Sequence, residues 1–222
     1  MSAQPIASAQ ISLPVASGET VVGDLVTPAG AHGIVVFAHG SGSSRLSSRN
    51  RSVAEVLQAR GLATLLFDLL TGSEESRDAI TAELRFDIPF LAGRLRDVIA
   101  HVREREDVGT LPLGLFGAST GAAAALVAAA GDPGVGAIVS RGGRPDLAAG
   151  SLERVSAPTL LLVGSLDTPV IEMNRRAFDR LEARDKKLVV VPGASHLFEE
   201  KGKLEEVARL AADWLERWLR AA

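Results

Sequence analysis

The sequence predicts an α/β protein with a doubly wound, mostly parallel sheet of eight strands. Short β-rich runs alternate with helical stretches almost to the end of the 222 residues, as βα units do. Some of these runs are continuously apolar, such as GIVVFA at 33–38, which is typical of a strand buried on both faces of a parallel sheet. Right-handed crossover connections between parallel strands place helices on both faces of such a sheet.

The elements follow this scheme in chain order. The runs 10–15 and 21–27 indicate an opening antiparallel pair of strands. The parallel strands are predicted at 33–38, 63–67, 113–116, 137–140, 159–163 and 187–191. The helices are predicted at 51–60, within 80–105, at 122–130, around 146–155, at 171–182 and at 204–219.

The spacing of apolar residues and the positions of glycines support these assignments. Val53, Val56 and Leu57 share one helix face, and Gly61 ends that helix. The apolar stripe of 204–219 could face a membrane or a partner, but covering the sheet explains it best. Only about 18 residues separate strands 137–140 and 159–163, which is enough for a short helix and little else. With no internal repeat or linker, residues 1–222 are expected to form a single domain.

Composition excludes several classes of protein. The net charge of −3 disfavours nucleic acid and anionic membranes as partners, because both require clustered positive charge. The absence of cysteine excludes disulfide scaffolds, thiolate zinc sites and cysteine nucleophiles. The N-terminus lacks a secretory pattern and the apolar runs are too short to span a bilayer, so we expect a cytoplasmic protein. A monomer and a small homo-oligomer both stay open.

The pentapeptide Gly117-Ala118-Ser119-Thr120-Gly121 carries the main chemical signal. It fits G-x-S-x-G, a sharp strand-to-helix turn that exposes a serine hydroxyl above the sheet. The pattern alone is weak, but here a strand-like run precedes it and an alanine-rich helix follows it. Ser119 is therefore the candidate nucleophile.

A serine nucleophile needs a base, and the base needs an acid to orient it. His196 follows the last predicted strand by a short loop, which makes it the best candidate base. Asp167 follows the strand at 159–163, and the order serine, aspartate, histidine agrees with the hydrolase arrangement. Asp68 is the competing acid, and His39 is a weaker alternative base that we expect to order its own loop.

The two remaining histidines fit the role of base less well. His32 lies before a strand, at the wrong edge of the sheet, and His101 lies on a predicted helix surface.

Acyl transfer also needs hydrogen-bond donors for the developing oxyanion. One should be the backbone amide of Thr120, and the other an amide of the glycine-rich loop after 33–38, which we place at Ser41 with Gly42 as the neighbouring possibility.

The same loop, with Asp68 after the next strand, allows a rival interpretation as a dinucleotide-binding oxidoreductase. Arg45 at the third-glycine position argues against it, because a side chain there obstructs helix packing. The sequence has no phosphate-binding P-loop and no H-E-x-x-H zinc motif, so we expect no cofactor and no metal.

The segments HGSGSS, GAST-G, GSLD and GASH resemble the α/β-hydrolase superfamily, from about residue 21 to residue 218. Within it they are most similar to the dienelactone-hydrolase-like group, which includes hydrolase domains joined to phosphoribosyltransferases. The resemblance implies nucleophile Ser119, acid Asp167, base His196 and oxyanion donors Ser41 and Thr120. Dienelactone hydrolases use a cysteine nucleophile, which this chain lacks, so the resemblance implies serine hydrolysis of a small ester or thioester rather than activity on dienelactones.

Many members of the superfamily that the chain resembles insert a cap after the sixth strand, and the short connection between 137–140 and 159–163 implies no cap domain and an open cleft here. Apolar residues near the strand ends are candidates to line this cleft. They are Leu70, Phe86, Phe90, Leu166 and Leu197. Arg141 and Arg144 follow a strand end and could hold a carboxylate or phosphate of the substrate. The alternative to an enzyme is a non-catalytic relic of the fold that binds a ligand or a partner protein.

Overall fold

A computed structural model describes residues 6–148 and 150–220. They form an eight-stranded sheet in the order β1-β2-β4-β3-β5-β6-β7-β8. The strands β1 and β2 pair antiparallel, as does β2 with β4, and all other neighbours are parallel. The strands are β1 (Ile6–Pro14), β2 (Thr20–Pro28), β3 (Gly33–Ala38), β4 (Leu62–Phe67), β5 (Leu113–Ala118), β6 (Val135–Arg141), β7 (Thr159–Gly164) and β8 (Lys186–Val191).

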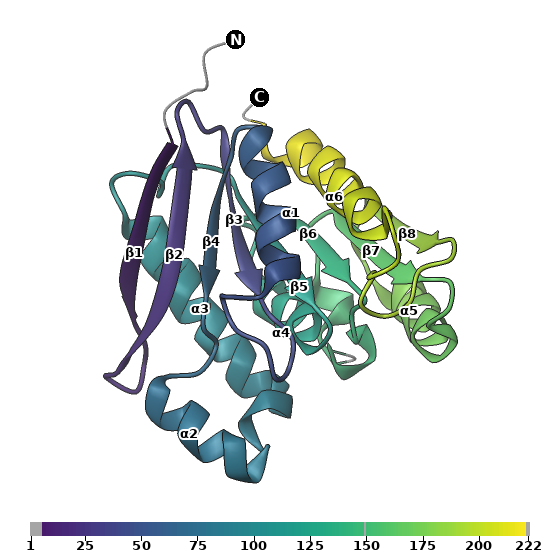
Figure 1. Ribbon diagram of the computed structural model, residues 1–222, viewed down its shortest axis with the longest axis horizontal. Helices are drawn as coiled ribbons and strands as arrows, with labels where there is room; N and C mark the ends of the chain where they lie inside the picture. Colours follow the sequence, from purple (N-terminus) through teal and green to yellow (C-terminus); the bar gives the residue numbers. More distant parts are fainter. Residues whose placement is uncertain (1–5, 149, 221–222) are drawn as a thin grey trace.

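Helices cover both faces of this sheet, as the sequence predicts (Figure 1). The helices α1 (Ser48–Ala59) and α6 (Lys203–Leu219) pack on one face, and α3 (Ile88–Glu104), α4 (Thr120–Ala129) and α5 (Thr168–Arg180) pack on the other. Two apolar clusters result, one on each face. Because the central strands are buried on both sides, their polar chemistry is confined to the loops at the strand ends.

All eight predicted strands are present, with ends shifted by up to four residues. The prediction of a short helix around 146–155 was wrong. The described part of this segment contains two 3₁₀ turns, η2 (Pro145–Ala148) and η3 (Leu152–Arg154), and residue 149 lies outside the described residues. Pro145 allows a helix to begin, but Gly150 interrupts it, and the described residues between β6 and β7 form no cap domain.

A helix that the sequence analysis missed, α2 (Gly72–Thr81), follows β4 and is joined by η1 (Leu84–Phe86) to α3. It projects beyond the carboxyl ends of the strands (Figure 1). Ala82, in a left-handed conformation, ends α2, and Asp87 then caps α3 by accepting a hydrogen bond from the amide of Phe90. The predicted helix within 80–105 therefore begins only at Ile88.

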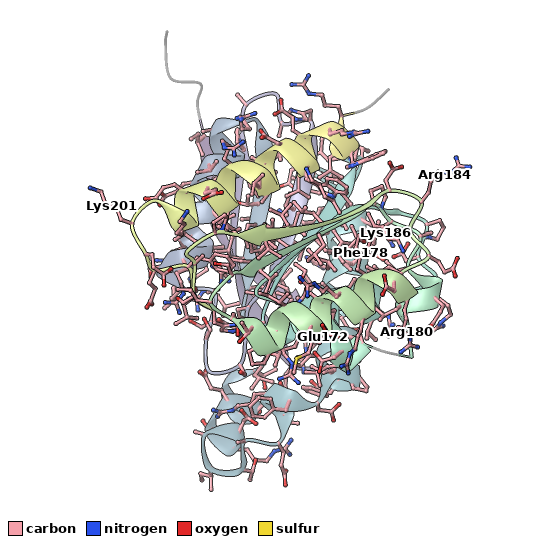
Figure 2. All side chains as sticks on the ribbon, turned by 90° about the vertical axis from the view of Figure 1, so that its right-hand side faces the viewer. Glu172, Phe178, Arg180, Arg184, Lys186 and Lys201 are labelled. Atoms are coloured by element: carbon pink, nitrogen blue, oxygen red, sulfur yellow. The ribbon has the colours of Figure 1, made fainter. Side chains whose placement is uncertain are left out.

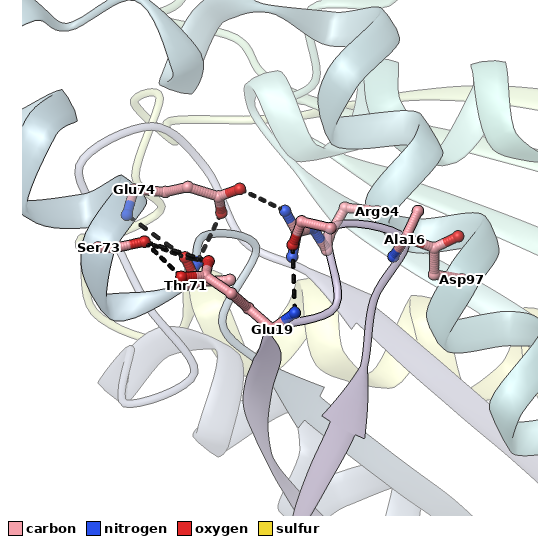
Figure 3. Close-up of polar contacts among 8 residues, drawn as sticks. Ala16, Glu19, Thr71, Ser73, Glu74, Arg94 and Asp97 are labelled. Atoms are coloured by element: carbon pink, nitrogen blue, oxygen red, sulfur yellow. Dashed lines mark hydrogen bonds and ion pairs between the residues drawn. The ribbon is translucent and has the colours of Figure 1, made fainter.

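The start of α2 is fixed by a polar cluster between the β1–β2 hairpin and α3 (Figure 3). Thr71 and Glu74 form a reciprocal capping box, with 2.7 Å between the Thr71 amide and Glu74 Oε2. The other oxygen of Glu74 pairs with the buried Arg94 at 2.7 Å. The hydroxyl of Thr71 donates to Glu19 at 2.7 Å, which ties α2 to the hairpin. The start of α2 is thus held in place by hydrogen bonds and an ion pair to the rest of the fold.

The opposite side of the molecule is closed by α5 against β8 (Figure 2). Lys186 Nζ donates to the carbonyl oxygens of Phe178 and Leu181 at 2.7 and 2.8 Å, and it lies 4.8 Å from the centre of the Phe178 ring. These contacts join the end of α5 to the start of β8.

Candidate active site

Ser119 lies in the sharp turn between β5 and α4 with φ of 50° and ψ of −119°. A positive φ is costly for a residue with a side chain, of the order of 1–3 kcal/mol, and persists only where the surroundings enforce it. Two hydrogen bonds enforce it here: the Ser119 amide donates to Arg141 O at 3.2 Å, and the Arg144 amide donates to Ser119 O at 3.1 Å. The turn is therefore built from the neighbouring strand as well as from its own sequence.

Glycines make this turn sterically possible. A Cβ on Gly117 would overlap the backbone of Ala122, and a Cβ on Gly121 would overlap the carbonyl oxygens of Ala38 and His39. Both glycines of the G-x-S-x-G pattern are thus required by close backbone approach, at the start of α4 and between β3 and α4.

The predicted acid and base meet at the same edge of the sheet. His196 Nδ1 lies 2.6 Å from Asp167 Oδ2, and Asp167 is the better buried of the two side chains. Asp167 is also the N-cap residue of α5, yet its side chain makes no capping hydrogen bond. Because a carboxylate accepts, Nδ1 carries the hydrogen and Nε2 is left free to accept a proton.

The loops after β7 and β8 are held together so that this pair can form. The Leu166 amide donates to Ala194 O at 2.9 Å, and the Gly193 amide donates to the Ser165 hydroxyl at 2.7 Å. Gly164 ends β7 directly beneath this crossing, where a Cβ would collide with the carbonyl oxygens of Ala194 and Ser195. The close crossing, made possible by Gly164, brings the histidine loop to the aspartate loop.

Ser119 and His196 both lie against the residues at the end of β6. Gly142 follows Arg141, and a Cβ at Gly142 would lie 3.5 Å from His196 Cε1 and 2.9 Å from His196 O. The Ser119 hydroxyl forms no hydrogen bond with any residue in 6–148 or 150–220. In free enzymes the nucleophile–base hydrogen bond is commonly long and shortens when substrate binds, so this geometry is compatible with catalysis.

The two predicted oxyanion donors lie side by side, but they are not equally available. The Ser41 amide donates to the Thr120 hydroxyl at 2.8 Å, which brings the loop after β3 against the start of α4. The Thr120 amide has no acceptor within the described part of the chain. Gly40 also contacts the turn, because a Cβ there would lie 3.2 Å from Ser119 Cβ.

His39, the alternative base, has a structural role. Its Nε2 accepts from the Leu69 amide at 3.0 Å and its Nδ1 lies 2.9 Å from Gly40 O, so the ring is neutral with the hydrogen on Nδ1. Burial lowers its pKa, against smaller opposing effects of Gly40 and nearby carboxylates. Both ring nitrogens are occupied, so His39 ties the loop after β3 to the turn after β4.

Asp68, the alternative acid, is also occupied. It accepts from the Arg45 amide at 2.9 Å and from Arg45 Nη1 at 2.6 Å. This pairing closes the glycine-rich loop and leaves neither group in the position that a dinucleotide-binding unit would need. It weakens the oxidoreductase interpretation.

A cleft of about 390 Å³ opens beside the turn that carries Ser119. Its walls come from the loop after β3, the turn after β4, α2, η1 and α3, and its lining includes Ser41, Leu46, Leu70, Asp78, Arg85, Leu91 and Thr120. The α2–η1 wall was missed at the sequence level, although the T-x-x-E spacing at 71–74 is a capping-box signal that could have revealed it.

Of the apolar residues expected to line the site, Leu70 lines this cleft and the others do not. Phe86, Leu166 and Leu197 are exposed, at 57%, 64% and 39%, and do not line this cleft. They surround the site on η1 and on the loops after β7 and β8. Their role in substrate binding stays a prediction.

The two arginines expected to bind an anion differ sharply. Arg144 forms a two-pronged ion pair with Asp146, at 2.9 and 2.8 Å. Arg141 is buried, with only 7% exposed, and its guanidinium donates to no residue that the structure describes.

This sheet order, with a serine turn after β5 and an Asp–His pair on the loops after β7 and β8, defines an α/β hydrolase by its fold. A model of the dienelactone hydrolase family matches residues 21–221, and the chain belongs to this family. No helix among the described residues is long and apolar enough to cross a membrane.

Comparison with known proteins agrees with this family. The structure is similar to a dienelactone hydrolase from Anabaena variabilis, with 55% identity, a TM-score of 0.94, and coverage of 97% of this chain and 99% of that one. An esterase from Pyrococcus furiosus shares the fold, with a TM-score of 0.79 at 17% identity over 96% of this chain and 92% of its own.

Two curated relatives from Mycobacterium tuberculosis are each 58% identical over 202 residues. Their names assign them provisionally to the phosphoribosyl transferases. The match covers 90% of this chain and 44% of each relative, so the chain spans less than half of their length.

Proposed function

We propose that this chain is a serine hydrolase that cleaves small carboxylic esters or thioesters through an acyl-enzyme. The observation that carries the proposal is the 2.6 Å contact between His196 Nδ1 and Asp167 Oδ2 beside the strained turn of Ser119. Family membership and the esterase neighbour support hydrolysis in general. The serine mechanism and the type of bond cleaved are what we add.

In the proposed reaction Ser119 Oγ attacks the substrate carbonyl carbon while its proton passes to His196 Nε2. The tetrahedral intermediate collapses, the bond to the alcohol or thiol breaks, and the leaving group takes the proton from Nε2. Water then attacks the acyl-enzyme with the same base, which releases the carboxylic acid and restores Ser119. Asp167 holds the imidazole tautomer and stabilises its charge during both steps.

The amide of Thr120 is the first proposed oxyanion donor, because it points from the start of α4 without an acceptor in the described chain. The Ser41 amide is the second. Its bond to the Thr120 hydroxyl holds it next to the first donor, and it must turn or share its hydrogen when an oxyanion forms. Gly42 is open on its Cβ side and is the adjacent donor that could replace Ser41.

The experiment is covalent labelling. A fluorophosphonate should modify Ser119, and Ser119→Ala should lose both the labelling and the hydrolysis of p-nitrophenyl acetate and butyrate. Ser12→Ala is the matched control, because it removes an exposed serine hydroxyl on β1, away from the proposed site. Retention of hydrolysis by Ser119→Ala would refute the assignment.

The second candidate is a non-catalytic member of the fold. The missing hydrogen bond between the Ser119 hydroxyl and His196 favours it. Folded wild-type protein that shows neither fluorophosphonate labelling nor hydrolysis across an ester series would establish this alternative.

Phosphoribosyl transfer is not part of the proposal. The relatives that carry this name are matched over 44% of their length, and the matching residues here build the hydrolase sheet and its loops.

A further inference from the structure

Arg141 is a buried cation without a partner beside the proposed nucleophile. It ends β6, and no described residue accepts a hydrogen bond from its guanidinium, whose Nη1 is fully covered. By contrast, Arg94 is equally buried but pairs with Glu74. Buried charges in folded proteins are almost always paired, so an unpaired one calls for a ligand or a function.

The surroundings of Arg141 disfavour its positive charge without removing it. Its guanidinium carbon lies 5.9 Å from the centre of the Phe116 ring, within the apolar cluster under α1 and α6. Burial, and then repulsion by Arg49, lower the pKa of Arg141 to about 10, so it stays charged at neutral pH. Arg49 donates to the exposed Glu199 at 2.8 Å. No carboxylate among the described residues pairs with the Arg141 guanidinium.

Arg141 lies on the side of the proposed site from which the leaving group departs. Its backbone oxygen accepts from the Ser119 amide at 3.2 Å, and the next residue, Gly142, packs against the His196 ring. The described cleft lies on the other side of Ser119, toward β4 and α2. In the proposed mechanism His196 gives its proton to the leaving group, so the leaving group departs on the Arg141 side.

We propose that Arg141, with Arg49 beside it, binds an oxyanion, a carboxylate or a phosphate, carried by the leaving group of the ester or thioester. This inference rests on the proposed hydrolase function and narrows its substrate class. A guanidinium offers paired donors that match both kinds of oxyanion. Arg144 is less suited to this role because Asp146 already neutralises it through Nε and Nη2.

The first test measures anion binding without hydrolysis. The thermal unfolding midpoint of the wild type is titrated with inorganic phosphate against sodium chloride of matched ionic strength. We expect a saturable rise with phosphate, because a ligand that binds only the native state stabilises it. Arg141→Met should lose this rise, and Arg103→Met should keep it, since Arg103 pairs with Asp132 at the opposite edge of the sheet.

The outcomes of this test are decisive even where a variant folds poorly. A wild type that responds to phosphate no more than to chloride overturns the proposal without any variant. Equal phosphate responses in the wild type and Arg141→Met also overturn it. Arg141→Lys serves as the second variant, because it keeps the charge but loses the paired donors, and a weakened saturable response is expected.

The second test separates an anion on the substrate from a free anion. The ester pair is 4-acetoxybenzoate and its methyl ester, which share the acetyl group and differ in a carboxylate on the leaving group. The ratio of kcat/KM for the anionic ester to that for the neutral ester should fall at least about tenfold in Arg141→Met, as for loss of a charged hydrogen bond.

An unchanged ratio together with lost phosphate binding would overturn the leaving-group assignment. Failure of the wild type on both esters would count against the hydrolase function, while the phosphate titration would still decide the anion site.

Discussion

Gly164→Ala should disable the proposed site by moving the histidine loop. An added Cβ would lie within 2.5 Å of the carbonyl oxygens of Ala194 and Ser195, whereas real Cβ atoms stay at 3.0 Å or more, so the loop must retreat by at least 0.5 Å. His196 follows directly, and its contact with Asp167 is only 2.6 Å long. Misplacement of a catalytic group by about 1 Å costs about 10²-fold.

We therefore expect kcat/KM for p-nitrophenyl acetate to fall between about tenfold and about 10²-fold, or about 1.4–2.7 kcal/mol of transition-state stabilisation. Fluorophosphonate labelling of Ser119 should slow by a similar factor, counted only on protein that is folded by circular dichroism. Gly93→Ala is the matched control, because its Cβ meets nothing within 4 Å in α3 and alanine favours a helix. Wild-type kinetics in folded Gly164→Ala would refute the reasoning.

Three further predictions concern the acid, the buried histidine and the α2 anchor. Asp167→Asn should lower kcat by about 10³–10⁴-fold, measured with the same ester, because the amide no longer holds the correct tautomer; a loss under tenfold would contradict the role. His39 has a folded-state pKa below its unfolded value, so stability is full above about pH 6.5 and is lost below it, by at most about 1.4 kcal/mol per pH unit. Urea midpoints at about pH 7.5 and about pH 5.5 should differ less in His39→Gln than in the wild type. Glu74→Ala should cost about 3 kcal/mol of unfolding free energy, because it leaves the buried Arg94 without its partner, whereas Glu172→Ala, at an exposed position on α5, should cost under about 0.5 kcal/mol. Equal costs in urea unfolding would refute the burial argument.

The sheet was predictable because its strands carry an unambiguous local signal. The runs at β3, β5 and β7 are short, apolar and bounded by glycine or polar residues, so period and length agree. The serine turn was predictable for the same reason, since its pattern lies between a clear strand and a clear helix. The edge on which Ser119, Asp167 and His196 lie then follows from the direction of parallel strands.

The wall of the cleft was not predictable from periodicity. The helix α2 is polar along most of its length, with Asp78 its one buried residue, so it lacks the apolar stripe that marks a helix. Its position is set by the contacts of Thr71 and Glu74 with residues far away in sequence. Hydrophobic periodicity depends on the local sequence only, so it cannot reveal contacts with such distant residues.

Side-chain contacts in the fold also determine which of the two arginines has a hydrogen-bond partner. Arg141 and Arg144 look alike in sequence, three residues apart after the same strand. The side chain of Arg144 finds Asp146 nearby, whereas the alternation of β6 turns Arg141 into the apolar cluster on Phe116. The packing of the sheet, and not the local sequence, therefore determines which arginine is free to bind an anion.

The burial of helix α4 affects how the proposed site would respond to salt. Nine of its ten residues are buried, and most of them are alanine, so the helix lies sealed between the sheet and its neighbours. Its positive end begins at Thr120, next to the proposed nucleophile. Dissolved ions weaken fields that run through water but reach a dry interior poorly. The attraction of that helix end for a developing negative charge thus comes from the interior of the fold, and added electrolyte should leave it largely intact.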